Sequence, residues 1–335
     1  MIQRISLFFV IVCAGTIASM GQEQPVNLAP LGISKLAYEV PIYTQITTSG
    51  TPGYIGIYNQ EVDRDIFVIE AQNSKPRKLV GGGGNPVWSP DGSQLAYCAW
   101  KGMGFGQIEI VNADGTGKRQ VTNMKGGACF PDWSPDGTKI AFTALSSGAT
   151  EKNLLGASHT EIYVVDKNGG DPIPILPGYD ARWSPGGSMF VLLRGPEKKG
   201  PNGSVWLATT DGKQSKVLVT SDRRVASVAW LPGGKSIAVS SVHNERCSIF
   251  RIYIDGSQSQ GNQTQKIAGD DKANWYEPSV SPDGKHLITI KDCASGYGDE
   301  NTGCRSFTIV LLDLGANTNE KLVDGSYYSV VWEKK

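Results

Sequence analysis

Apolar segments and tight turns alternate along most of the chain with a period of 45 to 50 residues. Each period contains an aromatic or aliphatic residue, a turn of the Ser-Pro-Asp-Gly type, and a short apolar segment directly after that turn. Proline presets φ at the second turn position, aspartate bonds the local backbone, and glycine tolerates the exit conformation. Each motif therefore predicts a reversal between two antiparallel strands. The five copies are Trp88–Gly92, Trp133–Gly137, Trp183–Gly187, Trp230–Gly234 and Val280–Gly284.

Each repeat has room for four strands. The apolar segment after the turn, such as Gln94–Tyr97, is followed by a third strand such as Ile108–Val111. Asp114-Gly115 then forms a second turn before a fourth strand at Arg119–Thr122. Four short strands in a unit of this length are typical of a β-propeller blade.

The two ends of the chain together supply one more blade. Tyr328–Trp332 repeats the strand that carries the repeat tryptophan, whereas Lys35–Tyr38, Ile66–Ile69 and Arg77–Val80 match the second, third and fourth strands. Joining them leaves no open sheet edge at that seam. We therefore predict an all-β, six-bladed β-propeller of four-stranded antiparallel blades, closed by the C-terminal strand. We expect the repeat tryptophans to pack between neighbouring blades.

The repeat resembles that of a known family. Trp-Ser-Pro-Asp-Gly followed by Leu/Ile-Ala-Tyr/Phe, an Ile-Tyr-Val-like strand and Asp-Gly is similar to the WD40-like (PD40) repeats of TolB-like six-bladed propellers. The resemblance covers nearly all of residues 22–335, and it implies one propeller domain over that range.

Residues 1–21 have the features of a secretory signal peptide. Arg4 precedes the apolar run Ile5–Ile17, and Ser19-Met20-Gly21 offers small residues at a cleavage site. This run is too short to span a bilayer of ~30 Å as an anchor. Lipidation at Cys13 is an alternative, although Val12 stands where a small residue is expected. We expect an exported protein, periplasmic or extracellular, in a compartment that permits disulfides.

Five cysteines follow the signal, so their number is odd. Cys293 and Cys304 bracket a polar loop, and a bridge between them is the first prediction. A Cys98–Cys129 bridge is the second choice, and Cys247 is then left over.

Charge and motifs exclude several functions. The 32 basic and 32 acidic residues leave no basic footprint for nucleic acid. No G-x-S-x-G, H-E-x-x-H, P-loop or C-x-x-C motif occurs, and the chain has only three histidines, so we assign no catalytic residue, metal or cofactor. Acidic groups at Glu61–Asp65 and at Asp292, Asp299 and Glu300 do not follow calcium-loop spacing and are interpreted as solvated charge. Asp132 and Arg182 each precede a repeat tryptophan, which predicts an ion pair between blades.

Strand order predicts where binding residues lie. The second-to-third-strand connections and the connections between blades share one face of a propeller, which we call the loop face; the other is the turn face. All long insertions fall on the loop face, where binding residues usually lie. They are Glu39–Asp65, Ala99–Gly106, Leu145–Thr160, Arg194–Gly203 and Asp292–Arg305. The candidate binding residues there are Tyr43, Tyr54, Trp100, Lys101, Phe105, Arg194, Trp275, Tyr276 and Tyr297.

Two functions remain open at this point. The favoured hypothesis is a non-catalytic exported scaffold that docks a protein partner, such as a cell-envelope protein, on the loop face. The alternative is a small-molecule or glycan site in the central funnel, with or without lyase or hydrolase activity. Loss of partner capture in loop-face variants would favour the first, and ligand-dependent thermal stabilisation would favour the second.

Overall fold

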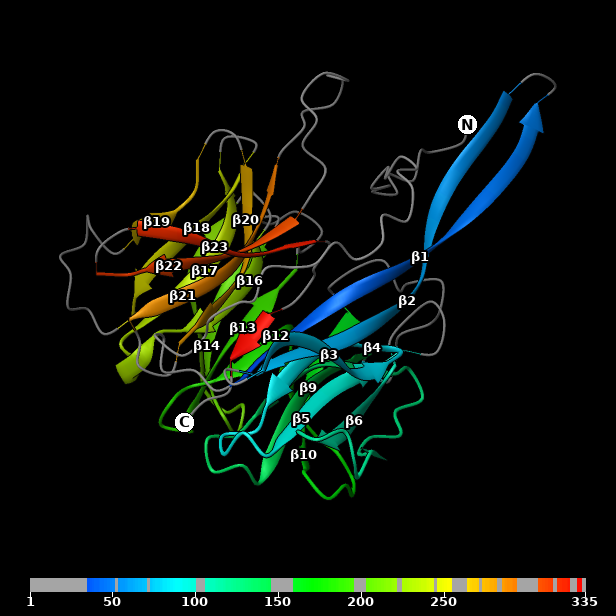
Figure 1. Cartoon of the computed structure of the whole chain (residues 1–335). Coiled ribbons are helices and arrows are strands. Elements are labelled where there is room, and N and C mark those ends of the chain that lie inside the picture. Colours follow the sequence, from blue (N-terminus) through cyan, green and yellow to red (C-terminus); the bar gives the residue numbers. More distant parts are fainter. Residues whose placement is uncertain are drawn as a thin grey trace, which may run out of the picture.

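The computed structural model describes residues 35–51, 54–70, 73–100, 106–145, 159–195, 203–221, 225–243, 246–254, 264–270, 273–281, 285–293, 307–315, 318–325 and 330–332. They form six four-stranded antiparallel sheets that follow one another around a ring (Figure 1). The predicted fold class is therefore confirmed. The described residues include no helix that is long and apolar enough to cross a membrane.

The first strands of the blades form the inner ring. Each of them contacts the first strand of the next blade, and the last contacts the first. In blade order they are β24 (Val330–Trp332), β4 (Gly83–Trp88), β8 (Ala128–Trp133), β12 (Tyr179–Trp183), β16 (Val225–Trp230) and β20 (Ala273–Val280). A short 3₁₀ turn, η4 (Pro232–Gly234), takes the place of the repeat turn in blade 5.

The other strands lie in chain order outward from the inner ring. The second strands are β1 (Lys35–Thr51), β5 (Gln94–Ala99), β9 (Lys139–Leu145), β13 (Met189–Arg194), β17 (Ser236–His243) and β21 (His286–Cys293). The third strands are β2 (Tyr54–Glu70), β6 (Gln107–Asn112), β10 (Thr160–Asp166), β14 (Gly203–Thr209), β18 (Arg246–Tyr253) and β22 (Phe307–Asp313). The fourth strands are β3 (Asn73–Gly81), β7 (Arg119–Gln120), β11 (Ile173–Pro177), β15 (Ser215–Ser221), β19 (Thr264–Ala268) and β23 (Thr318–Gly325).

Both ends of the chain meet in blade 1. The register pairs Leu36 with Trp332 and Tyr38 with Val330 in an antiparallel ladder between β1 and β24. The predicted closure of the ring is confirmed, because the last strand of the chain becomes the first strand of the blade that contains β1, β2 and β3.

The repeat tryptophans lie between blades, as predicted. The Trp133 indole Nε1 donates a hydrogen bond to the Val87 carbonyl (3.2 Å), and Trp230 Nε1 donates to the Arg182 carbonyl (2.9 Å). Both acceptors stand directly before the tryptophan of the preceding blade. Trp88 is 1% exposed and lies in an apolar cluster that joins residues of blades 1 and 2. These rings therefore hold neighbouring blades together.

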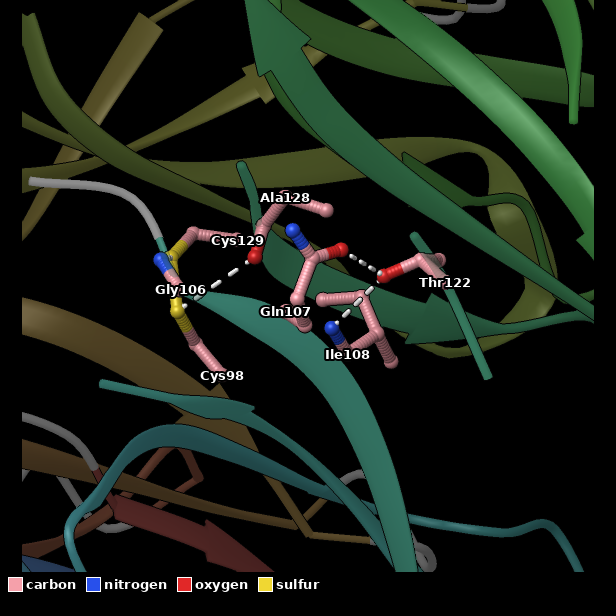
Figure 2. Close-up of a disulfide and its surroundings, with 7 residues drawn as sticks. All are labelled: Cys98, Gly106, Gln107, Ile108, Thr122, Ala128 and Cys129. Atoms are coloured by element: carbon pink, nitrogen blue, oxygen red, sulfur yellow. Dashed lines mark hydrogen bonds between the residues drawn. A yellow bond between two sulfur atoms is a disulfide. The ribbon is translucent and has the colours of Figure 1, made fainter. Parts of the chain in front are cut away.

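A disulfide joins blades 2 and 3. Cys98 in β5 bonds Cys129 in β8, with their Cα atoms 4.9 Å apart (Figure 2). The Gly106 amide donates to Cys129 Sγ (3.4 Å), and the Cys98 sulfur lies 3.4 Å from the Ala128 carbonyl oxygen. The second-choice pairing is thus confirmed. Cys247 is buried, 3.1 Å from Ser240 Oγ. The predicted Cys293–Cys304 bridge lies outside the residues whose side chains are described, as does the signal peptide.

The expectation of an irregular insertion over Glu39–Asp65 is wrong. β1 and β2 remain paired as far as Thr51 and Tyr54, and their outer halves project from the ring as a long hairpin (Figure 1). The physical reason is composition, since this segment is rich in isoleucine, threonine and tyrosine, which favour strands. We call residues 41–51 and 54–64 the β1–β2 arm.

Candidate functional site

The turn face is occupied by local hydrogen bonds. In blade 3, Asp136 Oδ1 accepts from the Ser134 hydroxyl (2.6 Å), the Thr138 amide (3.0 Å) and the Thr138 hydroxyl (2.8 Å). These donors lower the pKa of Asp136 to about 2, with the Ser134 hydroxyl as the largest cause. Asp91 in blade 2 has the same arrangement and also a lowered pKa. The turn carboxylates are thus used to build the turns.

The loop face carries three contacts between a cation and an indole ring. Each places a charged group over a tryptophan near the end of a strand: Arg64 over Trp100 at 5.0 Å, Arg194 over Trp206 at 3.9 Å, and Lys291 over Trp275 at 4.6 Å from the ring centroid. Such contacts restrict a long charged side chain to one position, and Lys291 also pairs with Asp270 at 3.1 Å.

Arg194 is the most firmly positioned of these cations. Its Nε donates to the Pro177 carbonyl (2.9 Å), and its guanidinium stacks on Trp206, whose Nε1 donates to Ser204 Oγ (2.8 Å). The side chain is therefore fixed between β11 and β14 at the loop-face rim of blade 4. The ring of Trp206 was missed by the sequence analysis. The strand register could have indicated this contact. Arg194 pairs with Ser204, and Trp206, two positions after Ser204, is then the diagonal neighbour of Arg194.

At its base, the β1–β2 arm contacts blade 2 of the propeller directly. The Arg64 guanidinium lies over Trp100 of the next blade, and the neighbouring Asp65 carboxylate forms an ion pair with Lys78 (2.6 Å). Asp65 is buried, so its interpretation as solvated loop charge is wrong.

The predicted binding residues separate into three groups. Trp100 and Arg194 are half-buried at the loop-face ends of their strands, and Tyr276 is half-buried in the middle of β20. Trp275 is only 4% exposed and belongs to an apolar cluster between blades 5 and 6, so it supports the fold and is omitted from the proposed surface. Tyr54 is in the strand pair of the arm, at a position whose side chain is not described. The structure does not describe Lys101, Phe105 and Tyr297, nor the side chain of Tyr43.

Four residues of the inner ring share an unusual backbone conformation. In four blades the residue three positions before the end of the first strand has a left-handed backbone, although none of the four is glycine. Each lies at an irregularity in the pairing with the second strand. Strained backbone of this kind re-aims side chains and is concentrated at functional sites. The residues are Asn85 (φ 51°), Phe130 (φ 55°), Asp180 (φ 51°) and Glu277 (φ 48°).

Arg182 is the centre of a charged cluster on this ring. Its Nη2 lies 2.6 Å from Asp180 Oδ1 in the same strand, and both side chains are largely buried. Burial alone would lower the pKa of the Arg182 guanidinium, but the fields of Asp180, Asp132 and Glu277 raise it above its ordinary value. Burial raises the pKa of the Asp180 carboxyl despite the opposing effect of Arg182. Carboxylates from three blades therefore act on one guanidinium.

The ion pair predicted between Asp132 and Arg182 stays a prediction: Arg182 forms an ion pair with Asp180 of its own strand, and Asp132 acts on the guanidinium through its field. Asp132 Oδ2 accepts the backbone amide of Trp183 (2.7 Å), so its carboxylate links blade 3 to blade 4. The Asp180 amide donates to Thr143 Oγ1 (3.0 Å) of blade 3 in the same way. These two hydrogen bonds join blade 3 to the inner strand of blade 4. Among the described residues, no group of histidine, cysteine and carboxylate side chains has the geometry to hold a metal ion.

Comparison with solved structures identifies the fold. TolB from Acinetobacter baumannii is 17% identical, with a TM-score of 0.65 over 92% of this chain and 70% of that chain. A structure described as TolB from Agrobacterium tumefaciens is also 17% identical, with a TM-score of 0.61 over 88% of this chain and 90% of that one. The chain has the six-bladed β-propeller fold of these TolB structures.

The same architecture occurs in enzymes. An oligogalacturonate lyase in complex with manganese is 11% identical, with a TM-score of 0.53 over 84% of both chains. At these identities the TolB-like propeller shares a fold with each of these proteins and nothing finer. No protein-family model and no curated protein sequence matches the chain.

Proposed function

We propose that this TolB-like propeller is a non-catalytic, exported scaffold that docks a protein partner on its loop face. The observation that supports this most is the set of cation and tryptophan contacts on that face, with Arg194 held over Trp206 at 3.9 Å and Arg64 over Trp100 at 5.0 Å. Tryptophan and arginine are the residues that dominate binding energy in protein interfaces, and pre-positioned side chains lose little entropy on binding.

The two faces differ in what they offer a partner. On the turn face, Asp91 and Asp136 use their carboxylates within their own turns. On the loop face, Arg194 is held at the rim by its Nε bond to the Pro177 carbonyl and by the ring of Trp206, so it presents a fixed cationic and aromatic pair. A cell-envelope protein with acidic and aromatic surface groups is the partner that this chemistry fits.

Export is part of the proposal. The Cys98–Cys129 bridge is buried and joins two blades, and such structural disulfides persist in oxidising compartments. Together with the signal-like residues 1–21, this supports a periplasmic or extracellular location. N-terminal sequencing of the exported protein should find cleavage after Gly21; an intact N-terminus in the cytoplasm would contradict it.

The docking proposal is tested by cross-linking the tagged protein in living cells and identifying captured proteins by mass spectrometry. Arg194→Ala and Trp100→Ala should each abolish capture of the partner that the unaltered chain retains. Lys213→Ala is the matched control, because Lys213 is an exposed cation on the turn face that pairs with Asp211 of its own turn. Melting temperatures verify that all three variants are folded. Undiminished capture by both loop-face variants would refute the proposal.

A second candidate function is a small-molecule or glycan site on the inner ring. It is favoured by one observation, the convergence of Asp180, Asp132 and Glu277 on Arg182 from three blades. The guanidinium and the carboxylates around it together offer hydrogen-bond donors and acceptors to a hydroxyl-rich ligand, whereas their net negative charge disfavours an anion. A concentration-dependent rise in melting temperature with neutral oligosaccharides, absent in Arg182→Met, would support it. A flat response to a broad panel would count against it.

A further inference from the structure

The β1–β2 arm is a two-stranded sheet with open edges. β3 pairs with β2 only over Asp65–Glu70, and β24 pairs with β1 only over Leu36–Tyr38. Beyond these limits, the described strands place no third strand beside either arm strand. An isolated hairpin is marginally stable in water, and a third strand is normally needed for independent stability. The arm therefore offers backbone donors and acceptors for another strand.

The outer half of β2 also lacks the devices that normally protect an edge. Val40 to Gln60 is a run of 21 residues without a charged side chain. The charged residues Glu61, Asp63 and Arg64 come only at its base. Natural edge strands are usually blunted by lysine, inward charges, proline within the strand or short length, because an open edge pairs with other chains. β2 has none of these along its outer half, which indicates an edge that is used for pairing.

The sequence of that edge reads the same in both directions. The first five residues of β2 are Tyr54-Ile55-Gly56-Ile57-Tyr58, a palindrome centred on Gly56. Two antiparallel strands related by a two-fold axis at Gly56 place Gly56 opposite Gly56, Ile55 opposite Ile57, and Tyr54 opposite Tyr58. A two-fold interface requires this self-complementarity, since the same patch serves both subunits. Identical aromatic and β-branched cross-strand pairs stabilise an antiparallel ladder.

We propose that the arm is a dimerisation element in which the β2 edges of two copies of this chain pair antiparallel about Gly56. The two arms then form one four-stranded sheet, with β1 on each outer side. The pairing ends before Glu61, so no like charges face each other within it. A partner of different chemistry would not require a palindrome, which is why the second copy is chosen as the occupant. The proposal is independent of the docking function.

The register makes a sharp test available. In this pairing residue 56 faces itself, so Gly56→Lys places two lysines opposite each other, and Gly56→Glu places two glutamates there. Sedimentation of the exported, full-length protein across a concentration series should show a dimer. Each charged variant alone should weaken dimerisation about tenfold or more, and an equal mixture of the two should restore it as a heterodimer.

Thr48→Lys is the matched control. Thr48 is the register partner of Gly56 within the arm, but it lies on β1, away from the proposed edge. It should leave the dimer largely intact, and unchanged melting temperatures should show that no variant disturbs the blades. A monomeric unaltered chain, or a lysine and glutamate mixture that stays monomeric, would overturn the proposal. Partner capture by a monomeric Gly56→Lys variant would leave the docking function standing separately.

Discussion

The Cys98 sulfur and the Ser240 hydroxyl occupy equivalent places in two blades. Each residue stands ten positions after a repeat tryptophan, and each lies against a carbonyl on the first strand of the next blade. Cys98 Sγ is 3.4 Å from the Ala128 oxygen, and Ser240 Oγ donates to the Trp275 oxygen at 2.9 Å. In blade 3, Thr143 at this position accepts from Asp180. The same site therefore joins successive blades by a hydrogen bond or, once, by a covalent bond.

Replacing the bridge by the serine arrangement should lower stability without changing the fold. In Cys98→Ser/Cys129→Ala, the new hydroxyl can donate to Ala128 as Ser240 does to Trp275. Loss of a cross-link that spans 31 residues should lower the free energy of unfolding by about 3 to 4 kcal/mol. Urea unfolding followed by tryptophan fluorescence measures this. An unchanged midpoint would show that the bridge contributes nothing.

The same variant isolates the other predicted bridge, between Cys293 and Cys304. If Cys293 and Cys304 are bonded, a reductant should still lower the urea midpoint of Cys98→Ser/Cys129→Ala, by the effect of closing a short loop. Peptide mapping without reduction identifies the linked peptides directly. Insensitivity to reductant together with alkylation of both Cys293 and Cys304 would contradict this pairing.

Replacing Arg182 alone should lower the free energy of unfolding more than replacing Arg182 and Asp180 together. Arg182→Met leaves the Asp180 carboxylate largely buried without its cation, which should destabilise the protein by about 3 to 5 kcal/mol. Asp180→Asn in the same background should recover part of that loss, and asparagine tolerates the left-handed backbone at this position. Thermal or urea unfolding of the two variants tests this order. Equal stability of the single and double variants would contradict an electrostatic role.

Acid should remove the contribution of Asp136. Its pKa is about 2 in the folded protein, mainly through the Ser134 hydroxyl, against ~3.9 in an unfolded chain. A lowered folded-state pKa stabilises the protein above the unfolded value and ceases to do so as the pH falls. The melting temperature of Asp136→Asn should therefore lie below that of the unaltered chain at neutral pH, and the gap should close between pH ~4 and about 2. Parallel curves down to the lowest pH would be inconsistent with this role.

Gly83 should not accept a methyl group. A Cβ atom there would lie 2.7 Å from Tyr97 Cδ2, and the Tyr97 ring is fully buried with its hydroxyl bonded to Glu109 at 2.6 Å. Gly83→Ala should thus destabilise the protein by about 1 to 3 kcal/mol. Gly186→Ala is the control, since a Cβ at Gly186 has no neighbour within 4 Å. Similar melting temperatures for the two variants would contradict this packing.

The repeated turn motif made the blades predictable from the sequence, whereas the β1–β2 arm could be predicted only from its strand-forming residues. Trp88–Gly92 and its relatives define turns by residue type, so strand order and ring closure follow from the sequence. The arm has no such motif, and its β-branched residues were interpreted as part of a long insertion because it interrupts the period. Its pairing is extended by local strand preference, from Tyr38 out to Thr51.

Two features of the candidate site were not predicted from the sequence: the burial of Trp275 and the charged cluster on the inner ring. Trp275 stands five residues before Val280, where the other blades have the buried residues Gly83, Ala128, Gly178 and Val225. An alignment of the repeats would therefore have predicted that the Trp275 side chain is buried. The left-handed conformations at Asp180 and Glu277 leave no sequence signature, because neither is glycine. Tertiary contacts impose these conformations, so the charged cluster could not be read from the sequence.

Closure of blade 1 by β24 orders the folding of the chain. The strands of blades 2 to 6 are close in sequence and can pair as local hairpins, whereas Leu36 and Trp332 meet across nearly the whole chain. Contacts of such long range form slowly, since the loop-closure entropy must be overcome before any contact is gained. The ring should therefore assemble as a row of blades and close last, and this three-residue seam is where it should first reopen.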